Sequence, residues 1–166
     1  TARAFAVSHQ LVNLGANPIK TSEFLFQTNS PQKIKLLGQV LSTLRLNRRG
    51  QIATITMTRK MLRDLNLREI DTEDITTLAR SIKGVEVVLF FKEMSKDRFR
   101  VSVRSRDDAN AAAVAEKFGG GGHMHAAGFT AVGPYAGLIE DIPRQVEALI
   151  RPPAAARQRR KAVPAS

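Results

Sequence analysis

The chain has 166 residues, of which 43% are apolar and 25% charged, a composition typical of a soluble globular protein. No apolar run approaches the roughly 20 residues that a membrane-spanning helix needs, and the absence of cysteine excludes a disulfide scaffold and thiolate metal ligands. The formal net charge of +11 favours a polyanionic partner such as nucleic acid, a nucleotide or polyphosphate.

Residues 1–46 are predicted to be a helical linker or the end of a preceding domain. Helix-start signals stand at Thr1, Asn17-Pro18 and Ser30-Pro31, because a side-chain oxygen there can accept from the first helical amides and proline fits the first turn. Helices are expected over residues 2–14, 18–27 and 31–44. They carry no catalytic constellation, and the isolated His9 is interpreted as an ordinary surface or core histidine.

Residues 47–150 are predicted to form an α+β (α/β-like) domain with a mixed β-sheet of about four to five strands covered by helices. The continuous apolar run 85–91 is typical of a central strand covered on both faces. The expected strands are 51–58, 85–91, 98–104 and 128–132. The expected helices are 58–65, 71–83, 111–118 and 135–150.

The strand expected over residues 98–104 alternates strictly between apolar and polar side chains. Its apolar face carries Phe99, Val101 and Val103. Its other face carries Arg98, Arg100, Ser102 and Arg104. The sequence therefore predicts a strand with one cationic, hydroxyl-bearing face.

The most distinctive stretch is the run of four glycines at residues 119–122, followed by His123. We interpret it as a loop between a helix and a strand, in which several glycine amides could point at one anion. Arg104 and Ser105 come from the end of the cationic strand and could contact the same phosphate. The run lacks the lysine-serine ending of a P-loop and follows a helix instead of preceding one.

Two other interpretations of the glycine run stay open. The glycines could merely permit a tight crossing, with His123 as a turn residue, although such a crossing needs only one or two of them. His123 and His125 could form a metal-binding pair, but no acid lies within the loop and alternate faces are expected of neighbouring strand residues.

Residues 151–166 are rich in Pro, Ala and Arg and are predicted to form a basic flexible tail. Such a tail could serve solubility alone, or it could add contacts to a nucleic-acid backbone.

The glycine-histidine stretch resembles the C-terminal domain that accompanies DHH-family phosphoesterases. The resemblance extends to the subgroup of bacterial oligoribonucleases (nanoRNases) and 3′-phosphoadenosine 5′-phosphate phosphatases. The segments that carry it are 118–129 and 101–105, with weaker similarity at 14–18, 81–87 and 90–93.

This resemblance implies roles for individual residues. In the family, a DHH domain holds two metal ions, usually manganese, and a metal-bound water attacks the phosphorus while the C-terminal domain presents the substrate. By resemblance, Arg104 and Ser105 grip a phosphate or the terminal nucleotide. The amides of Gly119, Gly120, Gly121 and Gly122 then line the same pocket, and His123 reaches the scissile phosphate as a catalytic residue.

The chain departs from the family in one large respect. It contains no Asp-His-His triplet and no Asp-x-Asp motif, and its histidines are His9, His123 and His125. Two-metal hydrolysis needs a cluster of carboxylate and imidazole ligands. We therefore expect no metal or other cofactor in this chain, with manganese bound by a DHH domain that the chain lacks. The start at Thr1, without an initiator methionine, agrees with a fragment of a longer phosphoesterase that is inactive alone.

The expected ligand is a short oligonucleotide or a nucleoside bisphosphate. The expected protein partners are the missing DHH domain and, in a homodimer, a second copy of the chain. No membrane partner is expected, and the expected location is cytoplasmic. One alternative function is a free-standing nucleic-acid-binding domain, although a chain with one Tyr and no Trp has little to stack bases on. A second alternative is part of an exopolyphosphatase-like enzyme. It differs from the leading phosphoesterase hypothesis only in its substrate, and the sequence does not distinguish the two.

Overall fold

The computed structural model describes residues 1–68 and 70–150. The tail predicted for residues 151–166 therefore lies outside the described residues. The contacts divide the chain into two units, one of residues 1–34 and one from Lys35 onward. No helix in the described ranges is long and apolar enough to cross a membrane.

The first unit contains helices α1 (Ala2–Asn13) and α2 (Pro18–Phe26), and α3 (Pro31–Leu41) begins in it. The predicted start signals are confirmed. The Thr1 hydroxyl accepts from the Ala4 amide at 3.3 Å, and the side-chain oxygen Oδ1 of Asn17 accepts from the Ile19 amide at 3.0 Å. Neither α1 nor α2 buries a residue.

The boundary between the units falls within α3, earlier than the predicted position after residue 46. Leu36 and Val40 of α3 are fully buried among residues of the sheet, so this half of the helix belongs to the second unit. The helix ends at Leu41, three residues before the predicted end. Shortly after it, the Thr43 hydroxyl accepts from the Thr56 amide at 2.8 Å and directs the chain into the sheet.

The second unit is built on a mixed sheet of six strands in the order β1-β2-β3-β4-β6-β5. Strands β2 and β3 are parallel, and the other neighbours are antiparallel. The strands are β1 (Arg45–Leu46), β2 (Ile52–Met57), β3 (Val87–Ser95), β4 (Arg98–Ser105), β5 (Gly121–His123) and β6 (Ala126–Val132). The predicted α+β class and mixed sheet are confirmed, with slightly more strands than expected.

The two strands that the sequence analysis missed lie at the two edges of the sheet. β1 has two residues and β5 has three, which is too short for an alternating pattern. β5 also begins with two glycines, a residue type depleted in strands. The predicted glycine loop is therefore wrong in its second half, which is an edge strand.

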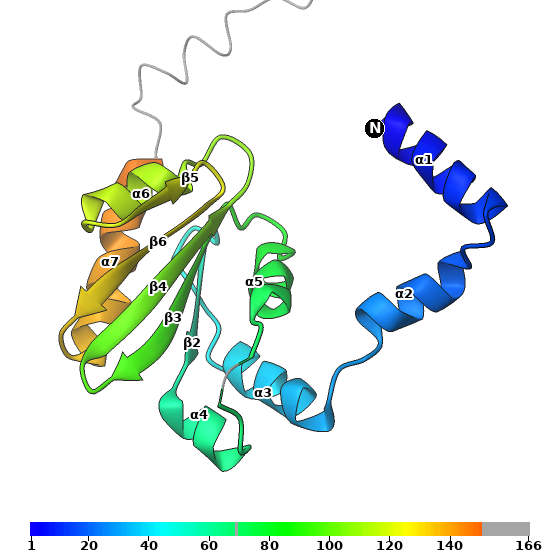
Figure 1. Ribbon diagram of the computed structural model, residues 1–166. Helices are drawn as coiled ribbons and strands as arrows, with labels where there is room; N and C mark the ends of the chain where they lie inside the picture. The colour runs from blue at the N-terminus through cyan, green and yellow to red at the C-terminus, as the bar shows by residue number, and fades with distance from the viewer. Residues whose placement is uncertain (69, 151–166) are drawn as a thin grey trace, which may run out of the picture. The chain divides into compact units, whose positions relative to one another are not determined.

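Helices cover the two faces of the sheet unequally (Figure 1). One face packs against α6 (Ala111–Lys117) and α7 (Tyr135–Ile150), with a core that runs from Ile52 of β2 to Phe129 of β6. The other face packs against α3, α4 (Arg59–Asp64) and α5 (Glu73–Arg80), and this core contains sheet residues of β2 and β3 only. On the second face of β4, β6 and β5, α5 contacts only the end of β4 at Arg104, and the rest is left uncovered.

We call this uncovered surface the open face. It is defined by the side chains that point away from α6 and α7 and by the glycines between them. They are Arg98, Arg100, Ser102 and Arg104 of β4, Ala126, Gly128, Thr130 and Val132 of β6, and Gly121 and His123 of β5. All of them are exposed or half-buried.

Candidate functional site

The first two glycines of the run end helix α6. The Gly119 amide donates to the Glu116 carbonyl at 3.0 Å, and the Gly120 amide donates to the Ala115 carbonyl at 2.9 Å. Gly119 has a φ of +73°, so the pair of bonds forms the usual glycine stop of a helix. Both amides therefore already have acceptors in α6, whereas the sequence predicted that they would point at a common anion.

Close packing on β6 explains two of the glycines. A Cβ on Gly120 would lie 2.2 Å from the carbonyl oxygen of Gly128, and one on Gly122 would lie 2.4 Å from the Cα of Ala127. Gly122 also has a φ of +151°. The Phe118 ring stacks on the Phe129 ring with centroids 4.6 Å apart, which holds the start of the run against β6.

Gly121 has no such structural reason to be glycine. A Cβ there would meet no atom within 4 Å, and its φ does not lie in the left-handed region. In the sheet it is aligned with Gly128 of β6, which in turn is aligned with Ser102 of β4. At this row the two aligned glycines carry no side chain, and we call them the glycine floor of the open face. A ligand can approach the peptide groups closely there.

The neighbouring row of the sheet brings Arg104 and His123 to the same face. His123 is aligned with Ala126, and Ala126 is aligned with Arg104. Directly opposite residues project from the same side of a sheet, and two strand spacings amount to about 10 Å. Only the small Ala126 side chain stands between the arginine and the exposed histidine, so one phosphate could contact both.

Ser105 lies on the other face of β4. Successive residues of a strand point to opposite sides, and Ser105 is buried. Its hydroxyl donates to the Met124 carbonyl at 3.0 Å and lies 3.3 Å from Nδ1 of His125, so it anchors the two-residue turn between β5 and β6. The structure therefore does not bring Ser105 together with Arg104, and in this structure its hydroxyl supports the hairpin that presents His123.

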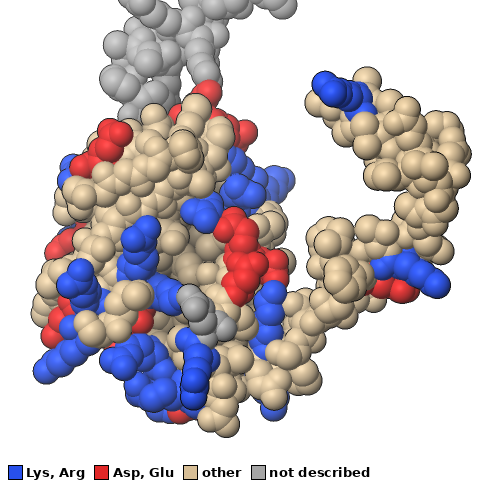
Figure 2. Space-filling model, viewed as in Figure 1, with Lys and Arg blue, Asp and Glu red and all other residues tan. Residues whose placement is uncertain are grey.

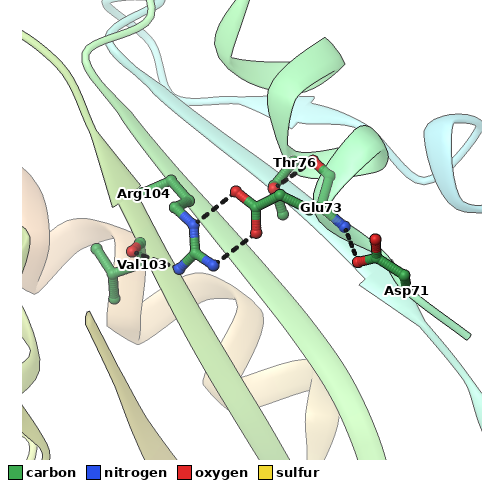
Figure 3. Close-up of polar contacts among 5 residues, drawn as sticks. All are labelled: Asp71, Glu73, Thr76, Val103 and Arg104. Atoms are coloured by element: carbon green, nitrogen blue, oxygen red, sulfur yellow. Dashed lines mark hydrogen bonds and ion pairs between the residues drawn. The ribbon is translucent and has the colours of Figure 1, made fainter. Parts of the chain in front are cut away.

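Arg104 is held in place by a residue that the sequence analysis did not single out. Its Nε and Nη2 donate to the two carboxylate oxygens of Glu73 at 3.1 and 2.7 Å (Figure 3). Its Nη1 donates to the Val103 carbonyl at 3.3 Å. A guanidinium has five N–H donors, so two of them have no partner among the described residues and are available to a phosphate.

The Glu73 and Arg104 pair also shifts both pKa values. The hydrogen bonds from Arg104 lower the pKa of Glu73, and desolvation opposes this only in part. The hydrogen bonds to Glu73 raise the pKa of Arg104. Glu73 lies in the first turn of α5, where a carboxylate is also favoured by the helix dipole. The position of Glu73 at the start of a helix was the one sequence signal that this residue matters, but it did not identify Arg104 as its partner.

We expect this pair to make stability depend on pH. Because the folded-state pKa of Glu73 is lowered, its contribution is complete above the ordinary glutamate pKa of about 4.3 and is lost as the pH falls through the folded value. The Glu73 side chain is 53% exposed, so Glu73→Gln should cost less than about 1 kcal/mol at pH 7. Thermal melts from pH 7 to 3 should show the difference from wild type vanishing in acid.

A double-mutant cycle controls this prediction. In an Arg104→Met background, Glu73→Gln should have little further effect on stability, because the pair is already broken. A wild-type advantage that is undiminished at pH 3, or one that is unchanged in the Arg104→Met background, would contradict the assignment of the effect to this pair.

On the side of the molecule drawn in Figure 2, Lys and Arg side chains form several groups, whereas the largest group of Asp and Glu lies over α5.

A separate cavity of about 360 Å³ lies between β1 and α7, lined among others by Arg45, Thr54 and Glu140. It contains none of the predicted site residues. Among the described residues, no three His, Asp or Glu side chains lie close enough together to hold a metal ion.

These observations define a class of domain: an α+β domain whose mixed sheet is fully covered on one face and carries cations, a histidine and a glycine floor on the uncovered part of the other. The chain belongs to the DHHA1 domain family, whose model matches residues 51–151. The match includes β4, the glycine run and β6.

Comparisons with known proteins agree with this membership. The chain is 32% identical over 133 residues to the bifunctional oligoribonuclease and PAP phosphatase NrnA of Thermus thermophilus, covering 80% of this chain and 39% of that protein. It is 33% identical over 99 residues to the probable NrnA of Streptococcus mutans, covering 59% of this chain and 31% of that protein. The chain thus spans less than half the length of either relative.

The fold also matches a solved structure. An exopolyphosphatase-related protein from Bacteroides fragilis superposes with a TM-score of 0.80 at 22% identity, over 89% of this chain and 44% of that chain. At this identity the likeness shows a shared fold. The predicted relation to DHH-family proteins is confirmed by the family match and the curated relatives.

Proposed function

We propose that this chain is the substrate-binding part of a phosphoesterase that hydrolyses short oligonucleotides or nucleoside bisphosphates. The observation that carries the proposal is the row of His123, Ala126 and Arg104 on the open face. A cation with two spare donors and an exposed imidazole face each other across a side chain no larger than a methyl group. This arrangement suits a phosphate, which accepts several charge-assisted hydrogen bonds at once.

Each residue has a role in this proposal. Arg104 binds the phosphate while Glu73 fixes the orientation of its guanidinium. His123 contacts the phosphate from the edge strand, close to the bond that is cleaved. Gly121 leaves the backbone of β5 bare, so that the nucleotide lies directly on this edge of the sheet.

In the same proposal the reaction itself depends on residues outside this chain. The described residues offer no cluster of metal ligands, so the manganese that the family implies has no fitting site among them. A DHH domain would bind the metals and supply the attacking water. The homodimer and the cytoplasmic location expected from the sequence stay predictions.

The test is a titration of the chain with 5′-phosphorylated diadenylate, followed by amide NMR shifts. We expect the shifts to concentrate at Gly121, His123 and Ala126 and to spare α7 on the covered face. With manganese added, we expect no release of mononucleotide. Absence of binding, or shifts confined to α7, would contradict the binding proposal, and robust turnover would contradict the placement of the metals in another domain.

A further inference from the structure

A second arginine on the open face has no role in the site described above. Arg100 lies four residues before Arg104 on β4, which places their Cα atoms about 13 Å apart along the strand. In its row of the sheet, Arg100 is aligned with Lys92 of β3 on one side and with Thr130 of β6 on the other. The row thus presents two cations and a hydroxyl side by side.

The Arg100 guanidinium leans away from its own row toward the glycine floor. A Cβ on Gly128 would lie 3.6 Å from Nε and 3.7 Å from Nη2 of Arg100. Gly128 belongs to the row between Arg100 and Arg104, aligned with Gly121 and Ser102. The guanidinium therefore points along the strand toward the Arg104 and His123 row, over backbone that carries no side chain.

The charge of this row is not balanced within the described part of the chain. Arg104 has Glu73 as its carboxylate partner, but the described residues provide no ion-pair partner for Arg100 or Lys92. Like charges on directly opposite residues of a sheet are destabilising, and the Arg100 guanidinium leans toward β6, away from Lys92. An anion bound in this row would remove the repulsion, and Thr130 would add a hydroxyl donor to it.

We propose that Arg100, Lys92 and Thr130 form a second phosphate subsite, so that the open face binds two phosphates of one nucleotide chain. This inference rests on the function proposed above, because it takes the Arg104 and His123 row as the first phosphate site. Adjacent phosphates of an oligonucleotide flank one ribose, as do the two phosphates of a 3′,5′-bisphosphate, so the two pairs have the same spacing. Rows about 13 Å apart along the strand exceed that spacing and suit phosphates two nucleotides apart. The subsite therefore selects oligonucleotides of three or more nucleotides over dinucleotides and nucleoside bisphosphates.

The test compares affinities of the full chain for adenosine monophosphate, 3′,5′-adenosine bisphosphate and 5′-phosphorylated oligoadenylates of two to four nucleotides, by calorimetry. Arg100→Gln should weaken binding of the tri- and tetra-adenylates about tenfold, as expected for one charge-assisted contact, and leave the monophosphate, the bisphosphate and the diadenylate nearly unchanged. The slope of log K against log salt for the tri- and tetra-adenylates should fall by about 0.7. Arg100→Lys should retain part of the affinity, because the charge remains.

Arg144→Gln is the matched control, since it removes an exposed arginine from α7 on the covered face of the sheet. Equal losses in Arg100→Gln and Arg144→Gln, or an equal loss for all the ligands in Arg100→Gln, would overturn the second subsite. Binding of the tri- and tetra-adenylates that needs Arg104 but not Arg100 would overturn this subsite alone. Absence of binding by the wild-type chain would overturn both proposals. Thermal melts of each variant show whether it is folded.

Discussion

Alanine at Gly120 or Gly122 is expected to destabilise the protein by about 3 kcal/mol, at the upper end of what overpacking costs. The added methyl group would overlap backbone atoms of β6, which cannot move without breaking the sheet. At Gly122 the φ of +151° adds backbone strain for any residue with a Cβ. Urea unfolding followed by circular dichroism measures the loss directly.

Gly121→Ala is the matched control for these two variants. It makes the same chemical change one residue away, in extended backbone and with open space around the new methyl group. Its stability should be unchanged or raised by about 0.5 kcal/mol, because alanine restricts the unfolded chain. Similar destabilisation in all three variants would show that the close approach to β6 does not explain the pattern.

The same contrast clarifies what the glycine run does. The sequence suggested that four glycine amides bind one anion. The alternative was that the glycines only permit a tight connection between a helix and a strand. The structure gives a fold reason for Gly119, Gly120 and Gly122, and the alternative therefore accounts for most of the run. Gly121 is the position at which ligand approach is the remaining explanation, and Gly121→Ala should weaken nucleotide binding without a loss of stability.

Strong periodic patterns made most of the fold predictable. The apolar run from Val85 predicted a central strand, and the strict alternation from Arg98 predicted β4 with its two faces. The edge strand β5 was not predictable in the same way, because two glycines and a histidine carry no alternation. Its pairing depends on close packing against β6, which is a tertiary property.

The candidate site was predictable in part. Arg104 and His123 were named from the sequence, and the register places them on one face. Ser105 was grouped with Arg104 from their position at the end of the cationic strand and again by resemblance, although alternation along the strand already put the two on opposite faces. Arg100 belonged to the predicted cationic face. Whether Arg100 can contact a ligand depends on how α3, α4 and α5 pack, because these helices determine which part of that face stays uncovered.

Glu73 illustrates a further limit. It is 31 residues from Arg104 in the chain, and nothing in the local sequence of either residue indicates the other. The pairing arises because α5 packs beside β3 and places its first turn over the end of β4. Long-range ion pairs of this kind depend on the relative placement of elements, which periodicity does not encode.

Arg104→Ala is expected to weaken the binding of 5′-phosphorylated diadenylate by about tenfold to a hundredfold, which is the range for losing hydrogen bonds to a charged group. The loss should not come from unfolding. Glu73 would lose its partner, but its half-exposed carboxylate stays hydrated, and the stability cost should stay below about 1 kcal/mol. Calorimetric titration gives the affinity, and a thermal melt of the same sample gives the stability.

Two further variants separate a specific contact from a general effect of charge. Arg104→Lys should recover little of the affinity, because an ammonium cannot contact Glu73 in a bidentate manner and still direct planar donors at a phosphate. Arg45→Ala removes a second arginine that is paired with a glutamate, Glu140, but from the edge strand β1, away from the open face. If Arg45→Ala weakened binding as much as Arg104→Ala, the affinity would reflect net charge. That result would contradict the placement of the phosphate on the open face. An effect confined to Arg104 places the phosphate at the row that it shares with His123.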